Sequence, residues 1–170
     1  SINKNKKFWN DHDLSDIPED MLKSMYLLKE AEYENSTTSD LSNAFNKYIK
    51  LLSKSTELKI ILPIYSENHF KHIIELLNES KVKNLELLVN DKILSSIKSN
   101  DDLNKNLMKN KKVKVKCSEN NLKLFLTCSD NFMSLSLFFK DGLYDDSQIL
   151  IGKDKNAMKW ALNLFKFFSD

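Results

Sequence analysis

The sequence contains no arginine, and all 26 of its basic residues are lysines. Arginine provides the planar fork that reads guanine and holds phosphate through paired hydrogen bonds, so its absence argues against sequence-specific reading of nucleic acid. Lysine can still hold phosphate as a point charge, and the net charge is +2. We attribute the missing arginine to an AT-rich genome, because lysine, asparagine and isoleucine are abundant. DNA binding by this chain alone is therefore expected to be weak and without sequence preference.

Glycine and proline are also scarce, with two of each among the 170 residues. A glycine-rich phosphate loop needs several glycines for close backbone approach, so such a loop is excluded. No signal peptide is visible, and the longest apolar run, residues 60–64 with its proline, is far shorter than the roughly 20 residues of a membrane span. These absences predict a cytoplasmic protein without a membrane partner.

The chain has two cysteines, Cys117 and Cys128. They are predicted to lie on the two strands of one hairpin with a turn at residues 118–121, where Cys117 would face Leu122. A disulfide between them is therefore not expected. Two free, buried thiols suit a reducing cytoplasm. A chain of this length buries enough surface to fold without a disulfide or a metal, and no cofactor is expected.

Hydrophobic periodicity predicts an α/β fold with one mixed sheet flanked by helices. Residues 58–65 and 82–90 are nearly continuous apolar runs, which are typical of buried strands, and residues 66–80 between them have helical spacing. Strand, helix and strand joined by short connections form a βαβ unit, whose two strands run parallel.

A different pattern follows in the second half of the chain. Lysine alternates with valine and cysteine over residues 112–117, which indicates a half-exposed strand. Residues 122–128 and 131–139 are predicted to follow as strands of an antiparallel meander, and residues 147–152 as a last short strand or ordered loop.

The remaining helices are predicted from apolar spacing and capping residues. Residues 21–28 have helical spacing and follow a capping box formed by Asp16 and Glu19. Asp40 is expected to cap a second helix over residues 41–52, so that the two form an N-terminal helix pair. Further helices are expected at residues 91–97, 101–109 and, capped by Asp154, 154–168.

The sequence contains no recognisable catalytic constellation. Residues 8–18, FWNDHDLSDIP, hold one histidine and three aspartates, but no second cluster at metal-ligand spacing occurs, so capping and packing explain them better than a metal. His69 and Lys71 have the His-x-Lys spacing of phospholipase D-type phosphodiesterases. The aspartate position of that motif is Leu76, and the pair falls inside a predicted helix. We therefore predict that the chain is not an enzyme.

Two stretches resemble a domain of archaeal regulators. Residues 8–18 resemble its Phe/Trp-x-x-His-Asp-Leu-Ser-x-Ile-Pro signature. Residues 138–165, with an Asp-Gly-x-Tyr-Asp turn and a tryptophan-bearing helix ending in Leu-Phe, resemble its ending. The domain is the middle, or effector, domain of Fil-type methanogenesis regulatory proteins, and the resemblance covers residues 6–169. It implies a fold similar to TrmB-type effector domains, phospholipase D-like without the catalytic motif. It also implies that residues 8–170 are the effector and dimerisation domain and residues 1–7 a linker or cut end.

The resemblance implies a ligand-sensing and dimerisation domain, without enzymatic activity, of a winged helix-turn-helix transcriptional regulator. An unknown small-molecule effector would change its conformation or pairing, and DNA would be bound only through the missing N-terminal domain. The apolar faces of helices 21–28 and 41–52 exceed what one small sheet can cover, so a symmetric homodimer is predicted. The alternatives are a dimerisation scaffold without a ligand and a degenerate phospholipase D-like phosphodiesterase. Asp16, where the family often has glycine, is a departure that leaves ligand specificity open.

The aromatic pair at the start of residues 8–18 needs an apolar surface, so we expect this segment to lie against the sheet beside the turn at residues 141–146. That position is near the carboxyl ends of the strands, where open α/β sheets bind ligands. The candidate ligand-binding residues are His12, Tyr65, Asn90, Tyr144 and Asp145. The alternative is that these polar groups only satisfy one another.

Overall fold

One mixed seven-stranded sheet forms the centre of the protein, in a computed structural model that describes residues 2–170. Its strand order is β1-β7-β6-β5-β2-β3-β4. The strands are β1 (Glu32–Asn35), β2 (Glu57–Ile61), β3 (Asn84–Asn90), β4 (Val113–Ser118), β5 (Leu124–Ser129), β6 (Met133–Leu137) and β7 (Gln148–Gly152).

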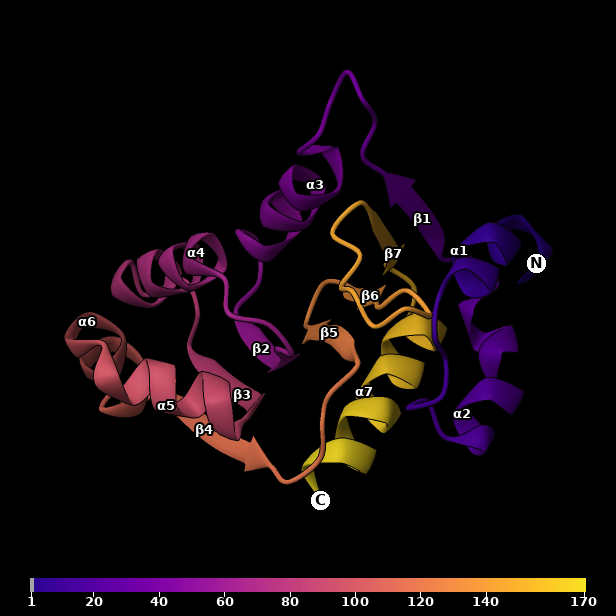
Figure 1. Ribbon diagram of the computed structural model, residues 1–170. Coiled ribbons are helices and arrows are strands. Elements are labelled where there is room, and N and C mark those ends of the chain that lie inside the picture. Colours follow the sequence, from indigo (N-terminus) through magenta and orange to yellow (C-terminus); the bar gives the residue numbers. More distant parts are fainter. Residues whose placement is uncertain (1) are drawn as a thin grey trace.

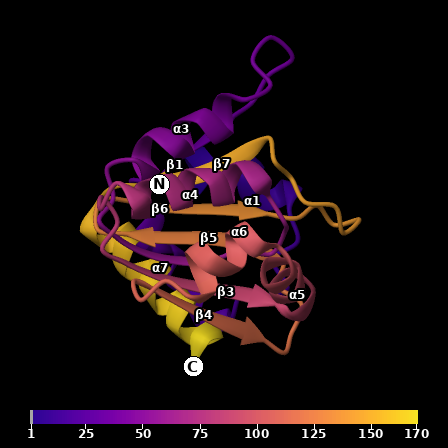
Figure 2. The same ribbon diagram turned by 90° about the vertical axis from the view of Figure 1, so that its left-hand side faces the viewer.

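Helices cover both faces of this sheet (Figures 1 and 2). They are η1 (Ile2–Asn5), α1 (Lys6–Asp11), α2 (Glu19–Lys23), η2 (Met25–Leu28), α3 (Asn43–Leu52), α4 (Glu67–Asn78), α5 (Asp91–Ser99), α6 (Asp101–Leu103), η3 (Asn104–Met108) and α7 (Lys155–Ser169). Ile60 belongs to the same buried cluster as Phe70 of α4, on the face covered by α3 to α6. The next residue, Ile61, belongs to the cluster of Trp160 in α7, on the face covered by α1, α2 and α7. Successive strand residues point to opposite faces, so one apolar run supplies both cores.

The predicted βαβ unit is confirmed. β2 and β3 are parallel, with Leu58 opposite Leu85, and α4 connects them. α4 begins with a side-chain cap, because the Ser66 hydroxyl accepts a hydrogen bond from the backbone N–H of His69. A second crossover, through α5, α6 and η3, makes β4 parallel to β3.

The antiparallel meander is confirmed for β5, β6 and β7, but β4 is not part of it. β4 forms the edge beside β3, whereas β5 pairs with the opposite side of β2. The predicted hairpin carrying Cys117 and Cys128 is therefore wrong, although both thiols are free as expected. Cys117 is exposed, not buried, and donates to Asp91 Oδ1 over 2.9 Å. The lysine alternation identified a half-exposed strand but contained no information about its neighbour.

The predicted N-terminal helix pair does not form. Met21 of α2 and Leu28 of η2 pack in the α7 core, whereas Tyr48 and Leu52 of α3 pack in the core on the opposite face. Continuous helical spacing over residues 21–28 also concealed a break, because α2 ends at Lys23 and a 3-10 turn follows.

Two predicted caps are wrong as well. α2 has no side-chain cap, and Asp16 Oδ2 instead accepts the backbone N–H of Lys123 over 3.1 Å. α3 begins at Asn43, and Asp40 lies in a turn closed by backbone hydrogen bonds with Thr37. Aspartate satisfies backbone donors in turns as readily as at helix starts, so its position alone did not settle either cap.

β1 was not predicted from the sequence. Its sequence, Glu-Tyr-Glu-Asn, has no apolar face, yet Tyr33 lies opposite Leu150 of β7 in an antiparallel ladder. An edge strand can be polar on both faces, which removes the period of two that identifies a strand.

Residues 2–7, expected to be a linker, are helical in η1 and the start of α1. The buried side chain of Asn5 donates to the carbonyl of Ala31 over 2.8 Å. Among the described residues, no helix is long and apolar enough to cross a membrane.

Gly152 tests the packing of β7 against α7. A Cβ at this position would lie 2.5 Å from the Cβ of Ala157. We expect Gly152→Ala to lower the free energy of unfolding by about 1–3 kcal/mol, since overpacking a filled site forces backbone shifts. Chemical denaturation measures this cost. In an Ala157→Gly background the cost should shrink, and equal costs in both backgrounds would contradict the contact.

Candidate functional site

A cavity of about 340 Å³ lies at the carboxyl end of β2, where α3, the β2–α4 connection and strands β5 to β7 meet. Its lining combines apolar side chains, among them Phe45, Ile64 and Phe125, with polar ones. Ligand pockets combine these two features, because apolar walls exclude water while a few polar groups fix orientation. The location agrees with the crevice expected at the carboxyl ends of the strands.

Two of the five predicted ligand-binding residues, Tyr65 and Tyr144, line this cavity. Tyr65 follows β2 and is 41% exposed, so it lies at the rim. Tyr144 is half-buried, and its ring makes a T-shaped contact with Phe138. Burial raises the pKa of the Tyr144 phenol, so it remains a neutral hydrogen-bonding group across the physiological pH range.

Gln148, at the start of β7, is the lining residue with an unsatisfied polar atom. Its Nε2 donates to Asp145 Oδ2 over 2.9 Å and to Asp11 Oδ2 over 3.2 Å. Two carboxylate acceptors fix the amide orientation, so Oε1 is left as an acceptor. The side chain is 5% exposed, and Oε1 has no hydrogen-bond partner among the described residues. A buried polar atom without a partner costs about 1–3 kcal/mol, and this acceptor is closed to solvent in the structure.

His12 and Asp145 do not line the cavity but form a buried pair behind Gln148. His12 Nε2 lies 2.7 Å from Asp145 Oδ2, and both residues are almost fully buried. The other ring nitrogen of His12 contacts the carbonyl of Phe8 in α1. Burial alone would raise the pKa of the Asp145 carboxyl, but hydrogen bonds from His12 and Ser147 outweigh it, and the pKa lies below its ordinary value.

The expected position of residues 8–18 is confirmed. His12 forms a bridge with Phe139, and the backbone N–H of Asp13 donates to the carbonyl of Phe138 over 2.9 Å. Phe8 and Trp9 are buried, and Trp9 contacts Trp160 edge to face. The segment is therefore attached to the strand pair that carries the turn at residues 141–146.

Asn90 is the predicted site residue that lies elsewhere. It ends β3, and its Oδ1 accepts the backbone N–H of Ile93, which caps α5. Asn90 is not part of the cavity lining. Its position at the end of a strand suggested a ligand-binding role, but the Asn90 amide instead caps the start of α5.

The three charged or ionisable side chains of residues 11–13 bond with four different partners. Asp11 bonds with Lys7 and Gln148, His12 bonds with Asp145, and Asp13 pairs with Lys123 over 3.4 Å. Across residues 2–170, no group of three His, Cys, Asp or Glu side chains could hold a metal ion.

A second buried network lies beside the cavity. The Tyr48 hydroxyl, from α3, bonds with His69 Nε2 and lies 3.1 Å from Thr127 Oγ1. Burial lowers the pKa of His69 to about 3, so its imidazole is neutral at physiological pH. Within the described chain His69 Nδ1 has no partner. The histidine of the His-x-Lys pattern is thus enclosed in the core, whereas Lys71 is exposed.

Sequence reasoning missed Tyr48, Ser136 and Gln148 as lining residues. Tyr48 fitted the apolar face of a helix, and Ser136 and Gln148 stood in strands without any motif around them. Only the packing of α3 over β5 to β7 brings them together, so no local signal could have identified them.

The Asp145 pair gives a pH prediction. Its folded pKa is lowered, so the ionised carboxylate stabilises the fold above the ordinary aspartate pKa of about 4, and this stability is lost as pH falls below it. Asp145→Asn should lower the free energy of unfolding at neutral pH by about 1–3 kcal/mol. It should also flatten the acid limb of the stability profile measured by denaturation between pH 3 and 7. The exposed neighbour gives the control: Asp146→Asn should leave both unchanged, and an equal effect would contradict the role of the pair.

Comparison with known proteins agrees with this architecture. A solved structure described as TrmBL2, an archaeal chromatin protein with a novel mode of DNA binding, is similar with a TM-score of 0.61 and 16% identity, over 88% of this chain and 58% of that one. At this identity the likeness concerns the fold alone.

Sequence comparison gives the family. The chain is 27% identical over 168 residues to the methanogenesis regulatory protein FilR1 of Methanothrix harundinacea (strain 6Ac). That match covers 95% of this chain and 37% of the length of that relative. The family described as the middle domain of the methanogenesis regulatory protein FilR1 matches residues 41–170. This chain therefore belongs to the family of FilR1 middle domains.

Proposed function

We propose that this chain is the ligand-sensing and dimerisation domain of a cytoplasmic archaeal transcriptional regulator, without enzymatic activity. Residues 8–170 form the sensing domain, and a winged helix-turn-helix in another part of the regulator reads DNA. The FilR1 relative is a regulatory protein, and the TrmBL2 relative is described as binding DNA. The observation that carries the proposal is the cavity with the unsatisfied Gln148 acceptor.

The cavity's chemistry suits a small, uncharged ligand with a hydroxyl or amide donor. Its polar groups are neutral hydroxyls and the amides of Asn68 and Gln148, apart from Asp146, which is exposed. Of the lining residues none is lysine, so an anionic ligand would find no opposite charge inside. A donor placed against Gln148 Oε1 would regain the hydrogen bond that the free protein lacks.

Contiguous contacts connect this cavity to the N-terminal segment. Gln148 bonds with Asp145 and Asp11, Asp145 bonds with His12, and His12 contacts the Phe8 carbonyl in α1. A ligand that repositions the Gln148 amide therefore changes the bonds that hold α1. Such a shift could alter the spacing of two DNA-reading modules, provided that the ligand favours one arrangement.

A thermal-shift screen of small neutral metabolites tests ligand binding. A specific ligand at 100 times its Kd should stabilise the fold by about 2.7 kcal/mol and raise Tm. Ser42→Trp, at the exposed rim beside α3, should abolish the shift because the indole fills the entrance, while the unliganded Tm stays close to that of the parent. Ser39→Trp, in the same loop but not in the lining, is the matched control and should keep the shift.

Hydrogen exchange on the same samples tests the coupling. Ligand should change the protection of α1 amides as well as of residues lining the cavity. A Tm shift that survives Ser42→Trp would place binding elsewhere. If the protection of the α1 amides did not change, ligand binding would stand, but the proposed coupling of the cavity to the N-terminal segment would be contradicted.

Dimerisation is the second part of the proposal, and the structure supports it less than the apolar spacing of residues 21–28 and 41–52 did. Met21, Leu28, Tyr48 and Leu52 are covered within one chain, so the two helices do not leave a large unpaired surface. Support now comes from the prevalence of twofold homodimers and from exposed apolar side chains, such as Leu41 at 80% exposure. A scaffold that dimerises without a ligand is the alternative.

Light scattering coupled to size exclusion tests self-association. At high micromolar concentration we expect twice the chain mass of 19.8 kDa. A mass of one chain across that range would contradict the dimer and leave the ligand proposal standing.

A phosphodiesterase is the other candidate, and little favours it. His69 is fully buried with a neutral ring, and Lys71 lies two positions along the same helix, exposed. Residues two apart on a helix do not face each other, so the pair cannot hold one phosphate. The likeness to a phospholipase D fold stays a prediction.

A further inference from the structure

One edge of the protein carries an uncompensated run of positive charge. Residues 103–118 contain six lysines and no acidic residue. They form the end of α6, all of η3 and the edge strand β4. The lysine edge consists of Lys105, Lys109, Lys111, Lys112, Lys114 and Lys116.

These ammonium groups are available to a partner. Lys105, Lys109, Lys111 and Lys114 are exposed. Lys112 and Lys116 donate to backbone carbonyls of Leu77 and Ser169. No lysine of this edge forms an ion pair with a described carboxylate, which sets the edge apart from Lys7, Lys23 or Lys47.

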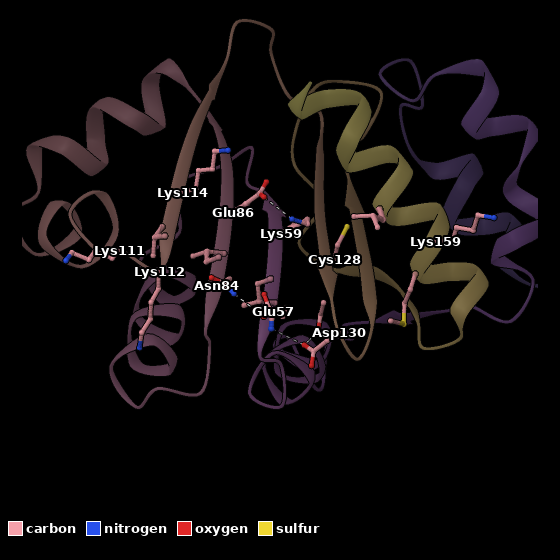
Figure 3. A pocket seen from close by; sticks show the side chains of 16 residues that line it. Glu57, Lys59, Asn84, Glu86, Lys111, Lys112, Lys114, Cys128, Asp130 and Lys159 are labelled. Atoms are coloured by element: carbon pink, nitrogen blue, oxygen red, sulfur yellow. Dashed lines mark hydrogen bonds and ion pairs between the residues drawn. The ribbon is translucent and has the colours of Figure 1, made fainter.

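A groove of about 710 Å³ continues the lysine edge across the part of the sheet between β4 and α7 (Figure 3). Three acidic residues line it, and each already forms a hydrogen bond or an ion pair with a neighbouring side chain. Glu57 accepts from Asn84, Asp130 accepts from Thr56, and Glu86 pairs with Lys59 over 2.9 Å.

Glu86 shows the local balance of charge. The hydrogen bond from Lys59 lowers the pKa of Glu86, and the positive charges of Lys114 and Lys116 lower it further. One carboxylate therefore faces three ammonium groups, and this corner of the groove has an excess of positive charge.

We propose that the lysine edge and the adjoining groove bind the phosphate backbone of duplex DNA without reading its sequence. The inference rests on the proposed function in one respect, because it takes DNA as the partner of the regulator. It revises the expectation that DNA is contacted only through another domain. The net charge of +2 understates the effect, because six of the 26 lysines fall within residues 103–118, a segment without an acidic residue.

The chemistry of the surface favours phosphate. Lys114 and Lys116 are alternate residues of one strand, so their stems are spaced roughly 6.6 Å apart in a row, similar to successive phosphates along a DNA strand. Lysine holds phosphate as a point charge, and without arginine the surface lacks the fork that reads bases. An acidic peptide could instead add to the free edge of β4. The lysines of η3 lie outside that ladder, however, and a peptide paired with β4 would not explain them.

Fluorescence anisotropy with a short labelled duplex of mixed sequence, over a range of salt concentrations, tests the inference on the 170-residue chain. The variant K105Q/K109Q/K111Q/K114Q removes four exposed charges and keeps both lysines that bond to carbonyls. Each lost phosphate contact should lower the slope of log K against log salt by about 0.9, so we expect a decrease of up to about 3–4 and at least a tenfold loss of affinity at low salt.

The matched control is K50Q/K54Q/K140Q/K153Q, which removes four exposed lysines away from this edge and changes the net charge equally. This control should retain most of the affinity and most of the slope of log K against log salt. The variant K105R/K109R/K111R/K114R keeps the four positive charges and should bind as the parent chain does. Equal losses in both glutamine variants would overturn the proposal, because net charge alone would explain binding. Tighter binding of a poly-glutamate peptide than of the duplex at equal salt would also overturn it. The thermal-shift response to a cavity ligand should persist in both variants, so failure here is distinguishable from failure of the sensing function.

Discussion

The buried bond between His12 and Asp145 holds together two parts of the chain that are 133 residues apart. It fixes the N-terminal segment on the strand pair that carries residues 141–146, and it lets Phe8 and Trp9 fill the core beneath α7. Two nearly fully buried ionisable side chains are tolerated there because each is hydrogen-bonded on every side that the structure describes. Loss of either partner would remove the side-chain bond that joins residues 8–18 to residues 141–146, so the position of the segment depends on the pair.

The Asp145 carboxylate also connects the N-terminal segment, residues 8–18, to the cavity. Asp145 Oδ2 accepts from both His12 and Gln148, so the N-terminal segment and the lining of the cavity share one acceptor oxygen. A rigid group shared between two sites is a physical basis for coupling, since a change at one alters the bonding available to the other. In the proposed function, Tyr65 and Tyr144 would contact the ligand, and His12 and Asp145 would hold the cavity wall in position behind them.

The two edges of the sheet differ in charge. β1 carries Glu32 and Glu34, each paired with a lysine from a neighbouring helix, whereas Lys114 and Lys116 of β4 form no ion pair with a described carboxylate. A row of like charges on β4 also opposes pairing of two copies through this edge, which is a common means of keeping an edge strand from aggregating. A dimer of this domain would therefore use another surface, and the β4 edge stays open for a polyanion.

The sequence by itself determined the local elements with strong periodicity. The apolar runs of β2 and β3, the cap at Asp154, and the packing of residues 8–18 against the sheet followed from spacing and from the need to bury aromatic rings. Tertiary structure alone decided the neighbour of β4, the pairing of the polar strand β1 and the separation of α2 from α3 onto opposite faces. Strand partners depend on crossovers that no local pattern encodes, and an edge strand needs no apolar face. The cavity belongs to the same class: Tyr65 and Tyr144 were predicted, but Gln148 became a site residue only because distant strands brought its amide between two carboxylates and left one oxygen unsatisfied.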